Sequence, residues 1–169
     1  MNPITLEVTI KSADVFKKIN RFGKMQLYTT ATLHGSNRGS PAECRTKADG
    51  LGGSRPLWDT LASFRVDEFE IDADRLVLVC EVKCKKSLVP NRSIGTVNIP
   101  VKELFQQSHQ RQSFFPEEED VAFVISSEMG KPRGVLYLSY LFRINGLVDF
   151  SPFHAPSAPP LCPSQEDVE

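Results

Sequence analysis

The residues with the clearest chemical potential lie in the stretch EVKCKKSLVPNRSIG, residues 81–95. It carries Lys83, Lys85, Lys86 and Arg92, and no acidic residue follows Glu81. Four cations gathered on one segment attract anions, whereas the chain as a whole has a net charge of only −1. Charged loops are most often simply solvated, so the interpretation depends on what the fold places beside these side chains.

Cysteine chemistry is not indicated. The chain has four cysteines, Cys44, Cys80, Cys84 and Cys162. Cys80 and Cys84 have the spacing of a metal or redox pair, but residues four apart on an extended strand are separated by roughly 13 Å. We therefore expect reduced thiols, as in cytosolic proteins.

Catalytic motifs are not found either. The histidines His34, His109 and His154 are scattered, and none stands in a nucleophile or metal-ligand motif. Gly130 and Lys131 are not preceded by the glycine of a phosphate-binding loop. The sequence predicts a protein that is not an enzyme.

The composition is that of one ordinary domain. Its 169 residues are 40% hydrophobic and 24% charged, and the chain lacks the strongly basic balance of nucleic-acid-binding proteins. The N-terminal MNPITLEV resembles no signal peptide, and no apolar run approaches the length of a membrane span.

A period of two dominates the chain. Leu6, Val8 and Ile10 alternate with polar residues, which is typical of a half-buried strand. Similar patterns predict seven further strands, over residues 27–33, 43–48, 60–66, 75–83, 93–100, 121–126 and 134–144. Only residues 101–110 suggest a helix, a short one. These elements favour an all-β antiparallel sandwich or barrel.

The C-terminal segment differs in composition. It reads DFSPFHAPSAPPLCPSQEDVE and is rich in proline, serine and terminal acids, which is typical of a disordered tail. We place the boundary near Gly146, with a domain over residues 1–146 and a tail over 147–169.

Several motifs together resemble the C2 domain, more narrowly the small single-C2 proteins of plants linked to cold and defence responses. They are FGKM-x-x-Y after the first strand, Pro-x-Trp before the fourth, and IGTVNIPVKEL in residues 94–104. The similarity runs from about Leu6 to Phe142. It implies an eight-stranded antiparallel sandwich of type II topology, in which the loops 13–24, 49–58 and 84–92 emerge at one end and face membranes.

The resemblance also identifies the positions that hold calcium in many C2 domains. Here these positions are occupied by Asn20, Gln26, Cys84, Lys86 and Asn91, with Arg92 beside them. Calcium requires six to eight oxygens, mostly from carboxylates, and cations repel it. We expect no cofactor and no tight calcium binding at the usual site. The alternative is an unusual weak site built from Asp14, Asp49 or Asp59.

The same loops are rich in cations. Eight of the twenty Lys and Arg residues fall in or directly beside the first and third of them, namely Lys17, Lys18, Arg21, Lys24, Lys83, Lys85, Lys86 and Arg92. Lys131 and Arg133 lie in a further connection, and Arg45 and Lys47 on a neighbouring strand. Each Lys or Arg near an anionic leaflet contributes about 1 kcal/mol. We expect these cations to bind anionic phospholipid, and Phe22, Leu88 and Val89 to enter the headgroup region.

The sequence thus predicts a monomeric, cytoplasmic module that associates peripherally with the plasma membrane and regulates stress or defence signalling. Its partners would be anionic phospholipid and an unidentified signalling protein, not nucleic acid. The alternative function is a calcium-responsive sensor that regulates a partner protein, with membrane binding secondary. Lipid binding predicts strong salt dependence and loss of binding when the loop lysines are neutralised.

Overall fold

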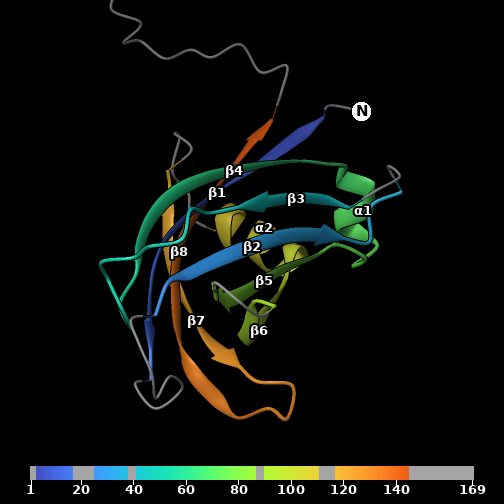
Figure 1. Ribbon diagram of the computed structural model, residues 1–169. Coiled ribbons are helices and arrows are strands. Elements are labelled where there is room, and N and C mark those ends of the chain that lie inside the picture. Colours follow the sequence, from blue (N-terminus) through green and yellow to red (C-terminus); the bar gives the residue numbers. More distant parts are fainter. Residues whose placement is uncertain (1–2, 17–24, 38–40, 87–89, 111–116, 145–169) are drawn as a thin grey trace, which may run out of the picture.

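The alternating pattern builds eight strands, as predicted (Figure 1). The computed structural model describes residues 3–16, 25–37, 41–86, 90–110 and 117–144. The strands are β1 (Ile4–Val15), β2 (Leu27–His34), β3 (Ala42–Arg45), β4 (Leu57–Val66), β5 (Val77–Cys84), β6 (Arg92–Pro100), β7 (Glu119–Ser126) and β8 (Pro132–Ile144).

The strands form two layers. Their hydrogen-bonded order is β3-β2-β5-β6-β7-β8-β1-β4, and every pairing is antiparallel. In the described residues, β6 and β7 share the single ladder pair Thr96–Ser126, and at this point the strands pass from one layer to the other. One layer is β3-β2-β5-β6 and the other β7-β8-β1-β4, which confirms the predicted antiparallel sandwich.

The core lies between the two layers. β1 contributes Ile4, Leu6, Val8 and Ile10 to this core, and these residues are at most 2% exposed. In the facing layer, β5 contributes Leu78, Cys80 and Val82. Their intervening neighbours face outward, so the side chains that can meet a partner are fixed by the period of the strands. The thiols of Cys44, Cys80 and Cys84 are free.

The prediction of a single helix was incomplete. The expected helix is α2 (Val101–Gln110), but a second, α1 (Glu68–Asp72), follows β4. Asp67 caps α1 by accepting a hydrogen bond from the Phe69 amide at 3.2 Å. At five residues, α1 is too short to show a helical period in the sequence, and this is why it was missed.

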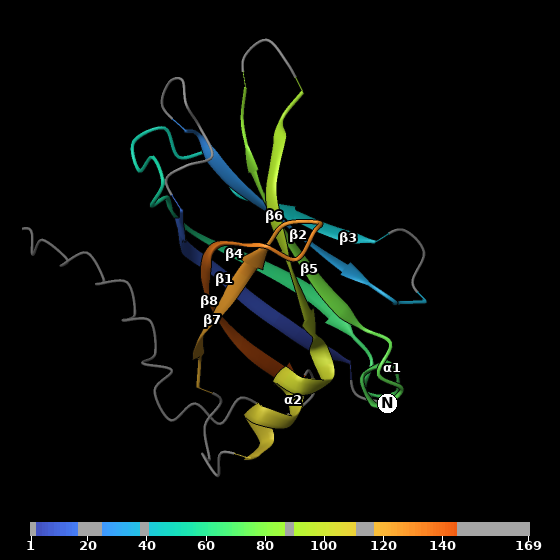
Figure 2. The ribbon, with the colours of Figure 1, turned by 90° about the horizontal axis from the view of Figure 1, so that it is seen from below.

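Four connections meet at one end of the sandwich, which we call the loop end. The Val15 amide donates to the Ser54 carbonyl at 2.8 Å, and the Phe16 amide to the Arg133 carbonyl at 2.9 Å. The Lys85 amide donates to the Gln26 carbonyl at 2.8 Å. The β1–β2, β3–β4, β5–β6 and β7–β8 connections are thereby tied together. Figure 2 shows the β5–β6 hairpin pointing away from α1 and α2, which lie toward the opposite end.

Candidate anion-binding surface

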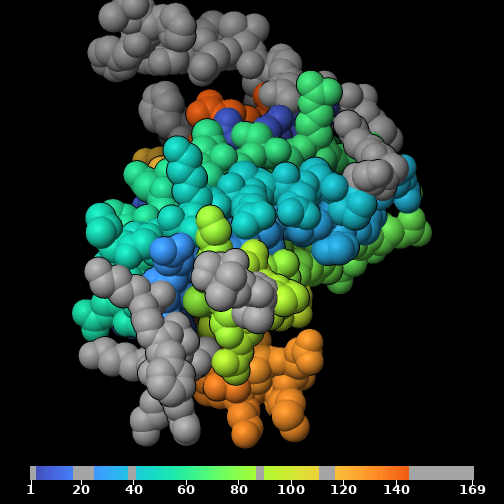
Figure 3. Space-filling model, in the orientation of Figure 1, coloured from blue at the N-terminus to red at the C-terminus, as the bar shows by residue number. Residues whose placement is uncertain are grey.

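Five described cations lie on the outer face of the β3-β2-β5-β6 layer or at its loop end. They are Arg45, Lys83, Lys85, Lys86 and Arg92, which we call the basic surface. Strand register places Lys83 opposite Tyr28 on the outer face, whereas Arg92 is opposite core-facing Cys84 and is exposed at the loop end. Arg45 is opposite Thr30, two residues further along β2. In Figure 3, β2 and β3 (blue to cyan) form one broad surface.

Tyr28 organises this surface. Its side chain is on the outer face, yet the residue is only 2% exposed. The Arg45 guanidinium lies over the ring, 4.1 Å from its centroid, and the Asn91 amide donates to the hydroxyl at 2.7 Å. A cation–π contact of this kind contributes on the order of 1 kcal/mol. Arg45 is thus oriented beside Lys83 while it remains exposed.

Asn91 closes the β5–β6 loop. Its side-chain oxygen accepts a hydrogen bond from the Lys86 amide at 3.3 Å while its nitrogen donates to Tyr28. The loop is therefore anchored to β2, and exposed Lys85 and Lys86 stand at a defined place beside it.

Glu81 moderates the positive charge. Its carboxylate lies 3.4 Å from the Lys83 ammonium, and both side chains are 31% exposed. Glu81 and Lys83 are two apart on β5 and therefore share a face. Lys83, counted among the lipid-binding residues in the sequence, is partly neutralised, whereas Lys85 and Lys86 are exposed to solvent.

Other predicted residues lie outside the described residues. These are the cations Lys17, Lys18, Arg21 and Lys24, the apolar residues Phe22, Leu88 and Val89, and Asn20. The predicted tail, residues 147–169, lies outside them too. Of the predicted set, the structure brings together Lys83, Lys85, Lys86 and Arg92 at the end of the β5–β6 hairpin.

The described residues at the usual calcium positions do not suit calcium. Cys84 is 4% exposed and belongs to the core, and Lys86 is an exposed cation. The Asn91 oxygen already accepts the Lys86 amide. Gln26 is exposed and has a single carbonyl oxygen to offer. Among the described residues at these positions, a dication would find one uncommitted side-chain oxygen, that of Gln26, and the positive charges of Lys86 and neighbouring Arg92.

Of the three aspartates proposed for an unusual calcium site, Asp49 and Asp14 have partners within the protein, and Asp59 is exposed on β4. The Asp49 carboxylate accepts the amides of Leu51, Gly52 and Leu57 at 2.9 to 3.1 Å, and these bonds lower its pKa. Asp14 lies 3.6 Å from the Arg55 guanidinium. Across the described part of the chain, no group of three or more His, Cys, Asp or Glu side chains is placed to hold a metal ion.

Three exposed apolar residues at the loop end were missed by the sequence analysis. Phe16 is 53% exposed, Leu51 is 96% exposed and Met129 is 85% exposed. They come from the β1–β2, β3–β4 and β7–β8 connections. Leu51 stands between Gly50 and Gly52, and Met129 before Gly130. A large apolar residue next to a turn glycine is the signal that would have found both.

The opposite end of the molecule is acidic. The segment around α1 reads DEFEIDAD, residues 67–74, and Glu68, Asp72 and Asp74 are exposed there. Exposed acids thus outnumber cations around α1, where Arg65, Arg75 and Lys102 also lie, whereas exposed Arg45, Lys85, Lys86 and Arg92 lie at or beside the loop end. The charge distribution is therefore uneven, which the net charge of −1 conceals.

Comparison with curated proteins identifies relatives in plants. The chain is 30% identical to "Protein SRC2 homolog" of Arabidopsis thaliana and 31% identical to "Protein SRC2" of Glycine max, over 138 residues in each case. Each match covers 82% of this chain but only 40% and 46% of the relatives, so the chain spans less than half of their length.

Solved structures share the fold. A C2 domain of plant extended synaptotagmin 1 aligns with a TM-score of 0.64 at 15% identity, over 83% of this chain and 94% of that one. A "C2 domain-containing protein from putative elicitor-responsive gene" aligns with a TM-score of 0.59 at 18% identity, over 86% and 92% of the two chains.

None of the helices in the described residues is both long and apolar enough to cross a membrane.

The match to a family model completes the identification. The sequence model of the C2 domain, a non-catalytic module, matches residues 4–116, and the remaining strands β7 and β8 complete the same sandwich. The chain belongs to the C2 domain family, as its sequence motifs predicted.

Proposed function

We propose that this chain binds anionic phospholipid through its loop end and associates peripherally with the cytoplasmic face of the plasma membrane. It does so without calcium at the usual site, and it acts as a regulator or adaptor in plant stress or defence signalling. The basic surface is the observation that carries the proposal. Lipid binding is a frequent property of C2 domains, and the plant relatives favour a role in plants.

Electrostatics supports this mode of binding. Arg45, Lys85, Lys86 and Arg92 are exposed at or beside the loop end, while the exposed acids of residues 67–74 lie around α1 at the other end. An anionic bilayer attracts the first group and repels the second, so the field of the protein itself turns the loop end toward the lipid. Four engaged cations contribute roughly 4 kcal/mol, which suits reversible, salt-sensitive binding.

The calcium-responsive alternative lacks comparable support. Asp49, one of its three candidate ligands, accepts three backbone amides with its carboxylate, and Asp14 is near Arg55. In our proposal, fixed cations stand where bound calcium would otherwise attract lipid headgroups. A signalling protein remains the proposed second partner.

Sedimentation with vesicles of phosphatidylcholine and phosphatidylserine tests the proposal. Wild type is compared with Lys83→Ala/Lys85→Ala/Lys86→Ala, each with calcium and with a chelator. The matched control is Arg65→Ala/Arg75→Ala/Lys102→Ala, which removes three cations from the end of the sandwich opposite the loop end. Both variants change the net charge equally, so only the position of the cations differs.

We expect equal wild-type binding with calcium and with chelator, loss of binding in the first variant, and retention in the second. Binding by wild type only with calcium contradicts the proposal and favours a site that uses Asp14, Asp49 or Asp59. Equal losses in both variants indicate attraction by net charge alone and contradict the assignment to the loop end.

A further inference from the structure

A strip of exposed apolar side chains runs over the outer face of the other layer, β7-β8-β1-β4, toward the loop end. Strand register places Val124 beside Val135 on β8, and Ala122 beside Tyr137. Tyr137 is in turn opposite Ser12, which is opposite Leu57. We define the apolar strip by its larger exposed members, Phe16, Leu57, Val124, Met129 and Tyr137; Val135, between them, is half-buried.

The exposure of these residues is high for side chains of their size. Leu57 is 71% exposed, Val124 57%, and Tyr137 42%. Phe16 continues the strip, because its amide bonds to the Arg133 carbonyl just beyond Val135. Met129 lies at the turn of the β7–β8 hairpin, which protrudes from the body in Figures 1 and 3. Contiguous exposed apolar surface of this kind marks a contact with a partner or a membrane.

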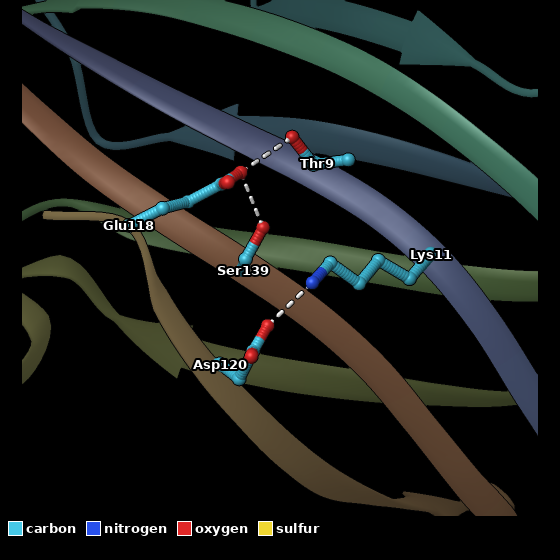
Figure 4. A network of polar contacts seen from close by, with 5 residues as sticks. All are labelled: Thr9, Lys11, Glu118, Asp120 and Ser139. Carbon is cyan, nitrogen blue, oxygen red and sulfur yellow. Dashed lines mark hydrogen bonds and ion pairs between the residues drawn. The ribbon is translucent and has the colours of Figure 1, made fainter.

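The strip ends where polar contacts begin, further from the loop end. Thr9 and Ser139 donate hydrogen bonds to the Glu118 carboxylate at 3.1 and 2.6 Å, and Lys11 forms an ion pair with Asp120 (Figure 4). These bonds lower the pKa of Glu118, so it stays charged near neutral pH. Leu61, which is 58% exposed on β4 opposite Thr9, is a further exposed apolar residue in this half of the face, and the residues of the apolar strip lie in the half nearest the loop end.

The charges around the strip suit an anionic bilayer. Lys131 is exposed in the hairpin that carries Met129, and Arg133 is the strand neighbour of Phe16. The acids near the strip are Asp14, which is opposite Val135 and 3.6 Å from the Arg55 guanidinium, Glu128 in the hairpin, and exposed Asp59, two residues after Leu57 on β4. Apolar groups flanked by cations match a bilayer interface, where acyl chains lie beneath anionic headgroups.

We propose that the loop-end part of the apolar strip, with Met129 and Phe16 leading, enters the headgroup region of the same membrane. Phe16 belongs to the first of the three loops expected from the family, and Met129 extends the lipid contact beyond these loops to the β7–β8 hairpin and the face behind it. This inference rests on the proposed function, and it adds a component of binding that salt does not screen.

The salt dependence of binding separates the apolar contact from the electrostatic one. Phe16→Ser/Met129→Ser is compared with wild type on the same vesicles at about 0.1 M and about 1 M NaCl. Full withdrawal of one large apolar side chain from water corresponds to a factor of about ten or more in partitioning. We expect the variant to lose at least tenfold in affinity at both salt concentrations.

Phe69 provides the matched control. It is 62% exposed on α1, at the opposite end from Phe16, so Phe69→Ser removes an equally exposed ring and is expected to bind as wild type. A direct measurement uses Met129→Trp and Phe69→Trp. We expect a blue-shifted emission on vesicles, with quenching by brominated lipid, for Met129→Trp alone. The native Trp58 is half-buried with its indole N–H bonded to the Leu27 carbonyl, and its emission should stay constant.

The outcomes distinguish the two proposals. This inference is overturned if wild type binds but the emission of Met129→Trp does not shift and Phe16→Ser/Met129→Ser keeps its affinity. The proposed function then still stands. An equal loss in Phe69→Ser also overturns it, because the effect would not depend on position. No binding by wild type to any of these vesicles overturns the proposed function and this inference together.

Discussion

Glu81→Gln should tighten membrane binding, although the residue is acidic and lies within the basic surface. The Glu81 carboxylate lies 3.4 Å from the Lys83 ammonium. It cancels one positive charge of the face that we expect to meet the lipid. The amide that replaces it has nearly the same shape and no charge, so Lys83 becomes available to anionic headgroups.

The magnitude follows from the charge. One additional effective cation near an anionic leaflet contributes about 1 kcal/mol, which corresponds to roughly fivefold in the dissociation constant. Stability should change little, because ion pairs between partly exposed side chains contribute about 0 to 1 kcal/mol. Tighter binding is therefore expected without a change in the midpoint of urea unfolding.

Vesicle titration at low and at high salt measures the effect. The matched control is Glu7→Gln, which breaks the ion pair with Arg143, 3.0 Å away, on the outer face of the other layer. We expect about fivefold tighter binding for Glu81→Gln at low salt, no gain at high salt, and no change for Glu7→Gln. An unchanged or weaker affinity for Glu81→Gln would refute the assignment of Lys83 to the lipid-binding face.

Three further predictions concern the framework of the site. Tyr28→Phe removes the hydroxyl that accepts the Asn91 amide and should lower the free energy of unfolding by about 1 kcal/mol in urea titrations, with weaker membrane binding. Gly134→Ala should destabilise by about 2 kcal/mol or more in thermal unfolding, because its Cβ would collide with the Asp14 carbonyl oxygen; an unaffected melting temperature would contradict the close packing of β1 and β8. Burial raises the pKa of the Cys80 thiol from 9.0 to about 12, so the folded state keeps a proton that the unfolded state loses, and the contribution of Cys80 to stability falls as pH rises across this interval. Cys80→Ala should therefore show a smaller alkaline loss of stability than wild type.

The sequence predicted the strands well because the apolar residues that define the alternating pattern are the same residues that form the core of the sandwich. Leu6, Val8 and Ile10 alternate in the sequence and are fully buried in β1. β4 begins earlier than predicted, at Leu57 rather than Thr60. It is an edge strand whose burial alternates, but its exposed positions include Leu57 and Leu61, so apolar and polar residues do not alternate as burial does. Such an edge strand, and a helix as short as α1, lack the hydrophobic period on which sequence patterns depend.

The candidate site was predictable in position but not in detail. Alternation of strand direction suffices to place the 84–92 loop at the loop end. Which side chains contact each other depends on strand register, and the sequence does not show that Arg45 lies over Tyr28 or that Asn91 reaches its hydroxyl. The sequence also does not show which apolar side chains are exposed. Met129 and Phe16 became candidates only when the packing of their neighbours was known.

The two proposed lipid contacts lie on outer faces of opposite layers, and this constrains how the domain can sit. A flat bilayer cannot cover both faces at once, but it can reach both where they meet, at the loop end. The contacts should then act independently, because Glu81 and Met129 belong to different layers and share no partner. In Glu81→Gln/Met129→Ser, the fold-changes of the two single variants should multiply within about a factor of two. Vesicle titrations of the double variant test this independence. If the gain from Glu81→Gln is lost or enlarged once Met129 is replaced, the domain tilts toward one face at the expense of the other.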